Sequence, residues 1–260
     1  MSSLAFPHLL RTPITIAPGS WADYARLAGH HYRLGHPRTF DAVLAAMHGS
    51  RVVGVLVASR PVLNATWRSA AWGDRYAAPT PKRDIAQRLN AEVRVISRVI
   101  VEPRYRGLGV ARRLVEAYLA HPLTRRTEAL AGMGRWCPFF ERAGMRRVEC
   151  EPPRRDEALA RVIAAAGFKP WMLADLSVAS RLLARNPRVR LGLEKWANAS
   201  RASRTRPICA QLLVLAASSI ASPPVAYVAE APSRKSLRAR SASEGLRGVG
   251  APTPPELAHR

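Results

Sequence analysis

Short apolar runs recur along the first 150 residues, and between them apolar residues take helical spacing. The β-branched and apolar runs predict strands at residues 12–16, 42–46, 52–58, 94–101, 128–133 and 145–149. Apolar residues three or four apart predict helices at residues 21–30, 109–121 and 139–143. Strands that alternate with helices in this way are typical of an α/β domain.

Residues 61–89 interrupt this pattern with a long segment that is rich in Trp, Arg and Pro. Loops of this length inside a compact domain are usually functional or disordered. Trp67, Trp72 and Tyr76 argue against disorder, so we expect an ordered but irregular loop.

The second part of the chain changes character twice. Residues 156–166, 174–184 and 191–199 have helical patterns and predict a helical extension over residues 151–199. From residue 200 to residue 260 the chain is rich in Ser, Arg, Ala and Pro, with little periodicity, which predicts a disordered basic tail. The folded domain itself is expected over residues 10–150. The most apolar segment, residues 208–222, is shorter than the ~18 to 20 residues that a membrane-spanning helix needs, so no membrane partner is expected.

Composition adds a strong positive charge of +23, with 41 Lys and Arg residues against 18 Asp and Glu. Nearly all of these cations are arginines, and they are scattered along the chain without a block of five. A GC-rich coding sequence produces this bias, so the charge alone is weak evidence for a nucleic-acid partner. Cys137, Cys150 and Cys209 lack disulfide or metal-type spacing. With no signal-peptide pattern at the amino terminus, we expect a cytoplasmic location.

One segment carries most of the chemical information: an apolar strand ending at Val101, a loop with two glycines, and a helix beginning near Gly109. The first N–H groups of a helix lack partners within the helix, and the helix dipole places partial positive charge there. Glycines allow the backbone to approach a ligand closely, and Arg106 adds a cation. This order of elements predicts a phosphate or pyrophosphate site.

Two motifs resemble the GNAT acyltransferase family. Arg106-Gly107-Leu108-Gly109-Val110-Ala111 fits its Arg/Gln-x-x-Gly-x-Gly/Ala signature, and Pro138-Phe139-Phe140-Glu141-Arg142-Ala143-Gly144-Met145 resembles its later Phe-Tyr-Glu-Lys-x-Gly-Phe segment. The resemblance implies the GNAT acyl-CoA N-acyltransferase fold, a mixed central sheet with flanking helices. It also implies transfer of an acetyl or similar group from acetyl-CoA, as co-substrate, to the primary amine of a small molecule or protein. The Arg106–Ala111 amides would hold the pyrophosphate, and Val99 and Val101 would pair with the pantetheine arm.

The catalytic groups are less clear than the binding loop. His31, Tyr32 and Glu102 are the candidates that line or border an acceptor cleft, with Glu92 as a further possible base. The family's usual acid is a tyrosine, and Phe140 stands at that position here. Tyr105, Tyr118 and Cys137 are alternatives, although Cys137 is better interpreted as a small buried hydrophobe. His30, His31 and His36 lack ligand spacing, so no metal site is expected.

A narrower resemblance concerns the acceptor. His31-Tyr32-Arg33, Ser59-Arg60-Pro61-Val62-Leu63-Asn64 and the segment from Met133 to Phe140 are similar to a GNAT subgroup of ATPase-fused acetyltransferases, to which the phage Mom DNA-modification protein is related. This resemblance implies a nucleobase acceptor, with Trp67, Trp72 and Tyr76 as stacking candidates. The alternative is that these rings cover the core. A nucleic-acid-binding module that retains a CoA site without catalysis is a further alternative. The oligomeric state is not predicted.

Overall fold

Seven strands form one mixed sheet in the computed structural model of the chain, which describes residues 13–31, 36–149, 151–199 and 208–231. The strands are β1 (Ile14–Pro18), β2 (Ala42–His48), β3 (Arg51–Ser59), β4 (Val93–Val101), β5 (Arg126–Ala131), β6 (Arg146–Val148) and β7 (Val225–Glu230). Their order is β1-β2-β3-β4-β5-β7-β6, antiparallel throughout except for the parallel pair β4 and β5. The α/β prediction is confirmed.

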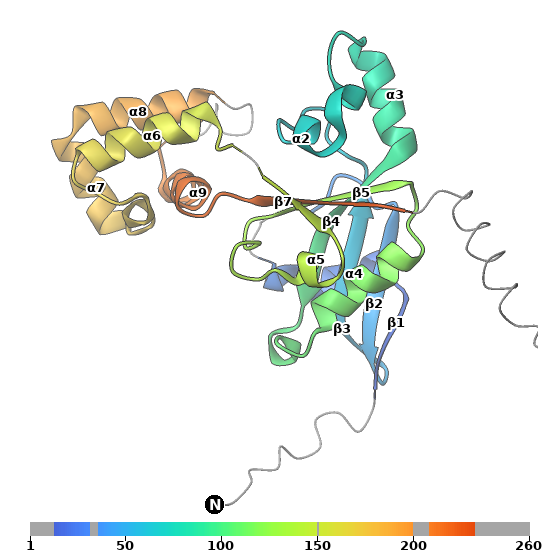
Figure 1. Ribbon diagram of the computed structural model, residues 1–260. Helices are drawn as coiled ribbons and strands as arrows, with labels where there is room; N and C mark the ends of the chain where they lie inside the picture. Colours follow the sequence, from blue (N-terminus) through green and yellow to red (C-terminus); the bar gives the residue numbers. More distant parts are fainter. Residues whose placement is uncertain (1–12, 32–35, 150, 200–207, 232–260) are drawn as a thin grey trace, which may run out of the picture.

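Helices cover both faces of this sheet (Figure 1). The face that we call the α4 face packs against α4 (Val110–Ala120) and α5 (Phe139–Arg142) through a core that includes Ile96, Leu114 and Ala129. The opposite face, called the α1 face, packs against α1 (Trp21–Leu27) through Tyr24 and Leu27. A short 3₁₀ turn, η1 (Ala28–His30), follows α1. The helices on these two faces limit the directions from which a ligand can reach the middle of the sheet.

The loop expected over residues 61–89 is largely helical, so that prediction is wrong in part. It contains α2 (Arg68–Trp72), the 3₁₀ turn η2 (Gly73–Tyr76) and α3 (Lys82–Glu92). On α3 only Ile85 and Leu89 are buried. Two apolar residues four positions apart are too few to reveal a helical pattern in the sequence. Trp67 and Trp72 pack against the strand residues Val148, Ala226 and Val228. These tryptophans therefore cover the core, as the second of the two interpretations expects.

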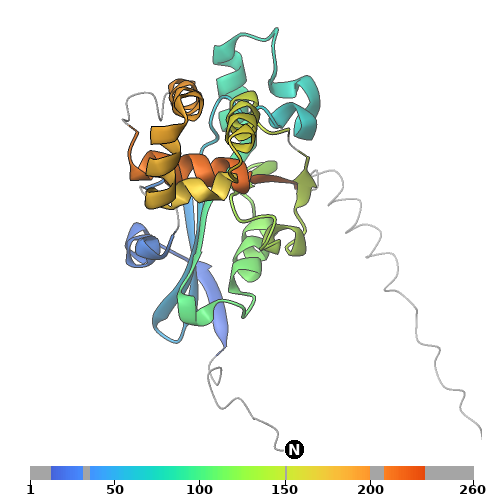
Figure 2. The same ribbon diagram turned by 90° about the vertical axis from the view of Figure 1, so that its left-hand side faces the viewer.

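A second group of helices has its own core and lies to one side of the sheet (Figures 1 and 2). It consists of α6 (Arg154–Ala165), the 3₁₀ turn η4 (Pro170–Ala174), α7 (Leu176–Arg185), α8 (Pro187–Asn198) and α9 (Ala210–Ala221). The core includes Leu159, Ile163, Leu193 and Leu212, each almost fully buried. The three helices expected between residues 151 and 199 are therefore present. No helix in the described part of the chain is long and apolar enough to cross a membrane.

The expected disordered tail over residues 200–260 is wrong for the part that the structure describes. Residues 210–221 form α9, and β7 then lies between β5 and β6, pairing with both. The sheet domain consequently does not end at residue 150, because its seventh strand follows the helical group. A six-residue strand is short, and its neighbours in the sheet are far away in the sequence, so its sequence pattern could not reveal this pairing. Residues 200–207 and 232–260 lie outside the described residues.

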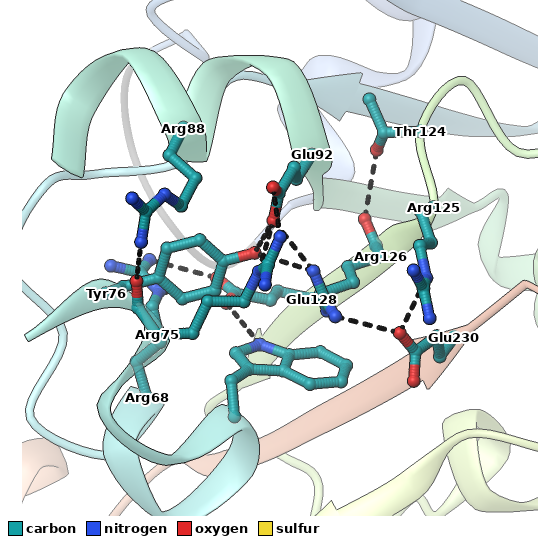
Figure 3. Close-up of polar contacts among 11 residues, drawn as sticks. Arg68, Arg75, Tyr76, Arg88, Glu92, Thr124, Arg125, Arg126, Glu128 and Glu230 are labelled. Carbon is teal, nitrogen blue, oxygen red and sulfur yellow. Dashed lines mark hydrogen bonds and ion pairs between the residues drawn. The ribbon is translucent and has the colours of Figure 1, made fainter. Parts of the chain in front are cut away.

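An ionic network joins α2 and α3 to the strands β5 and β7 (Figure 3). Glu128 on β5 is fully buried and accepts hydrogen bonds from Nε and Nη2 of Arg68 at 2.9 and 3.0 Å. Nη1 of Arg126 donates to Glu92 at 2.7 Å, and its Nη2 lies 2.9 Å from Glu230 on β7. Buried charges need such partners, and this network supplies them for Glu128, Glu92 and Arg126.

The same network predicts a pH effect on stability. The Arg75 guanidinium, helped by Tyr76 and Arg126, lowers the pKa of Glu92 to about 2. A lowered folded-state pKa stabilises the protein above the unfolded pKa of roughly 4.3, and this contribution is lost as the pH falls through about 2. Glu92→Gln is therefore expected to cost on the order of 2–3 kcal/mol at pH 7 and progressively less in acid. Urea unfolding at several pH values measures this. A control, Glu194→Gln at an exposed position of α8, should change little. A pH-independent difference would contradict the assignment.

Candidate active site

The parallel strands β4 and β5 separate at a bulge in the middle of the sheet. Val57 of β3 pairs with Arg98, but the next residue, Ala58, pairs with Ile96, so Ser97 is the extra residue. Its hydroxyl lies 2.7 Å from the hydroxyl of Ser59 and donates to the Val57 carbonyl at 3.2 Å. The pairing with β5 also ends at Ile96. Beyond this point the main chain of β4 has no strand partner on the β5 side among the described residues, and a gap opens between the two strands.

A cleft of about 590 Å³ occupies this gap. Five segments line it: His31 after η1, β4 from Ile96 onward, the loop and first turn of α4, the end of β5, and the loop that leads into α5. Its volume lies within the range of small-molecule and cofactor sites. The cleft therefore joins the predicted phosphate loop to the point where the sheet opens.

The predicted binding loop has the geometry that its glycines suggested. Gly107 and Gly109 have φ angles of 82° and 76°, in the left-handed region, and a Cβ at either residue would meet nothing within 4 Å. Glycine is thus required here by the backbone conformation and leaves open space for a ligand. Gly109 is the N-cap of α4. The first backbone N–H groups of this helix have no carbonyl partner within the helix.

Most of the predicted cofactor residues line the cleft together. They are Val99, Val101, Arg106, Gly107, Gly109, Val110 and Ala111. Leu108 is 45% exposed and is not among the lining residues, so only its backbone belongs to the loop. Arg106 donates from Nε to the Val101 carbonyl at 3.1 Å and from Nη2 to the His30 carbonyl at 3.3 Å. Arg106 therefore also connects the end of η1 to the end of β4.

The three catalytic candidates have different outcomes. His31 lines the cleft, next to η1. Tyr32 lies outside the described residues. Glu102 is not among the lining residues, and its carboxylate is held at 2.9 Å by Arg51 and at 2.7 Å by Arg104. Burial opposes ionisation of Glu102, but Arg104 and Arg51 together keep its pKa below the ordinary value. A carboxylate held in this way stabilises the end of β4, and its lowered pKa makes it a weaker base than an unpaired carboxylate.

The candidates for the acid also separate. Phe140 lines the cleft, and its ring lies 5.2 Å from that of Tyr227 on β7. Tyr105 lines the cleft as well, with its hydroxyl 2.8 Å from Nδ1 of His48. Tyr118 is buried in the core, away from the lining residues, and burial raises its pKa. Cys137 is exposed and lines the cleft, so its interpretation as a buried hydrophobe is wrong.

Sequence reasoning missed three features of the site. Ser97 forms the bulge, Arg98 lines the cleft, and Tyr227 supports the loop before α5 by donating to the Gly134 carbonyl at 3.1 Å. Arg98 had a detectable signal, because it is a charged residue inside a β-branched strand. Tyr227 had none, since it approaches the site only when β7 enters the sheet. The described residues contain no group of three or more His, Cys, Asp or Glu side chains placed to hold a metal ion.

Among solved structures, two acetyltransferases are similar to this chain. A histone acetyltransferase HPA2 and related acetyltransferase from Corynebacterium glutamicum is 17% identical, with a TM-score of 0.35, over 54% of this chain and 88% of its own. A mosquito arylalkylamine N-acetyltransferase like 5b is 16% identical, with a TM-score of 0.28, over 45% of this chain and 61% of its own. No protein-family model and no curated protein matches the chain. Both structures are acetyltransferases, the class that the resemblance to the GNAT family implies, but similarity this low carries no argument about activity.

Proposed function

We propose that the protein transfers an acyl group from an acyl-CoA thioester, acetyl-CoA in the first instance, to a primary amine. The observation that supports this most is that a glycine-rich helix start and the separation of β4 from β5 open onto one cleft. One end of the cleft suits a pyrophosphate, and the unpaired main chain of β4 suits an extended arm that carries amide groups. Both features come from the described residues and do not depend on the two solved structures.

The residues divide into a binding part and a reacting part. The backbone amides of residues 107–111 and the Arg106 guanidinium hold phosphate oxygens, since N–H groups and a cation converge there. The backbone N–H of Arg106 itself donates to the Pro103 carbonyl at 3.2 Å. Val99 and Val101 offer main-chain groups along the open edge of β4. The co-substrate supplies an activated carbonyl carbon. As the amine nitrogen bonds to this carbon, the carbon–sulfur bond breaks and the sulfur leaves with the electron pair as a thiolate.

The protein then has to handle two protons. His31 lines the cleft, and its imidazole can take the proton of the amine, either directly or through water. Phe140 cannot return a proton to sulfur. A thiol of ordinary acidity, with a pKa of about 8.5, already leaves readily as a thiolate, so solvent can protonate it afterwards. The site therefore needs positioning more than a dedicated acid.

No observation favours a nucleobase acceptor over other amines. Trp72 donates from Nε1 to Glu128 at 3.0 Å, and Trp67 packs on the sheet, so both rings have structural roles. The two alternative functions, a nucleobase-modifying enzyme and a non-catalytic nucleic-acid-binding module, stay predictions from the sequence. An acceptor screen that includes adenine nucleotides tests the first of these.

Titration with acetyl-CoA tests the proposal directly. Wild-type protein is expected to bind acetyl-CoA, and Arg106→Ala should weaken binding by roughly 10- to 100-fold, because a charge-assisted contact contributes about 1.5–3 kcal/mol. Isothermal titration calorimetry measures both. Arg161→Ala, at an exposed position of α6, is the matched control and should bind as the wild type does. If the folded wild type does not bind acetyl-CoA, the proposed function is wrong.

A further inference from the structure

Arg98 is a nearly buried cation among the residues that line the cleft. It lies on β4 one residue after the bulge, where β4 has already separated from β5. It is 9% exposed, lines the cleft, and donates from Nη1 to the Ser97 carbonyl at 2.8 Å. A guanidinium that is shielded from water attracts an anion more strongly than one at the surface, so the position of Arg98 bears on which ligand the cleft accepts.

The strand register places Arg98 on the α1 face of the sheet. Arg98 pairs with Val57. Two residues further along β4, Ile100 pairs with Val55, and both of these side chains pack in the core beneath α1. Val99 and Leu56, between these pairs, belong to the α4 face. Because side chains alternate along a strand, the guanidinium lies on the side opposite to α4.

The phosphate loop serves the other face and the other end of the cleft. α4 begins at this loop and, with α5, covers the α4 face. From Val101, beside the loop, to Ser97 the strand runs four residues, which is roughly 13 Å. A donor whose phosphates are bound at the loop therefore extends toward the bulge, and an acceptor has to approach its reactive end from the α1 face. Arg98 lies where that acceptor arrives, away from the donor's phosphates.

We propose that Arg98 binds an anionic group of the acceptor, so that the substrate is an amine that also carries a carboxylate or phosphate group. This inference rests on the proposed acyl transfer. An arginine presents a planar fork of donors that matches both groups, and it does so most strongly where water is excluded. Leu130, Met133 and Trp136 line the same cleft and are 41%, 52% and 70% exposed. They offer apolar contact to the remainder of the acceptor, so Arg98 is a specificity-determining residue.

Matched pairs of amines test this inference. Phosphoethanolamine is compared with ethanolamine, and phenylalanine with phenylalaninamide, using acetyl-CoA and mass spectrometry of the amide product. Wild type is expected to prefer the anionic member at least about 10-fold in kcat/KM. Arg98→Gln should raise KM for the anionic members about 10- to 100-fold, change the neutral members less than about 3-fold, and leave the Kd for acetyl-CoA unchanged. Which pair shows the larger preference identifies phosphate or carboxylate as the anion.

Two further variants separate specificity from folding. Arg98→Lys keeps the charge and should recover part of the preference, with an unchanged melting temperature. Arg112→Gln, which also removes a cation of the cleft but near the start of α4, should weaken donor binding without altering acceptor preference. Equal loss for both members of a pair, or no preference in the wild type, would overturn the role of Arg98 while donor binding stayed intact.

Direct acceptor binding keeps this inference distinct from the proposed function. If the wild type does not bind acetyl-CoA, the acyl-transfer proposal fails, and binding of phosphoethanolamine and ethanolamine is followed by NMR without donor. Selective binding of phosphoethanolamine by the wild type, lost in Arg98→Gln, would still support the anion site. Equal binding by the two proteins would overturn it.

Discussion

Substituting Gly109 with valine is expected to weaken acetyl-CoA binding by about 100-fold or more and to abolish measurable acyl transfer. Gly109 has a φ of 76°, and a β-branched residue tolerates this left-handed conformation poorly. The loop would rotate its amides away from the phosphate position, and the new side chain would also occupy the space that the ligand needs. A 100-fold loss corresponds to about 2.7 kcal/mol, which the strain and the lost contacts together can supply.

Gly167→Val is the matched control for this substitution. Gly167 follows α6, has a φ of 81°, and, like Gly109, leaves open space where a Cβ would be placed. Both variants should therefore lose a similar amount of stability in thermal unfolding, but only Gly109→Val should lose acetyl-CoA binding in calorimetry. If Gly109→Val bound acetyl-CoA as tightly as the control, the loop would not be the phosphate site.

Ending the chain after residue 200 is expected to prevent stable folding. This truncation removes β7, whose residues Val225, Ala226, Tyr227 and Val228 are almost fully buried and whose main chain pairs with both β5 and β6. Burying a large apolar side chain is worth about 1.5–3 kcal/mol, so the loss approaches the 5–15 kcal/mol by which proteins are usually stable. It also removes α9 from the core of the helical group.

A chain ending after Ala231 provides the comparison, because it retains every described strand and helix. Circular dichroism and thermal unfolding of the two truncated chains measure the difference. The longer one should unfold cooperatively, and the shorter one should be aggregated or lack a cooperative transition. Cooperative unfolding of the shorter chain near the wild-type temperature would show that β7 contributes little to the sheet.

The two phenylalanines that begin the short helix α5 show how a local signal and its tertiary context differ. The sequence identifies Phe140 as lacking the hydroxyl that the GNAT family usually places there. It does not indicate that Tyr227 packs 5.2 Å from this ring, because 86 residues separate the two positions and no periodicity relates them. The contacts of the fully buried Glu128 are also not indicated by the sequence. Its partners Arg68 and Trp72 come from the segment expected to be an irregular loop.

What the sequence by itself determined is local: the strand ending at Val101, the loop with Gly107 and Gly109, the helix that follows, and the helices of residues 151–199. These features follow from backbone preferences and short-range periodicity, which act within about ten residues. Only the tertiary structure decided that β7 completes the sheet, that Glu102 is held by two arginines, and that Arg98 faces the cleft. Each of these depends on contacts between distant segments, and such contacts form only when strands far apart in the chain take up one register.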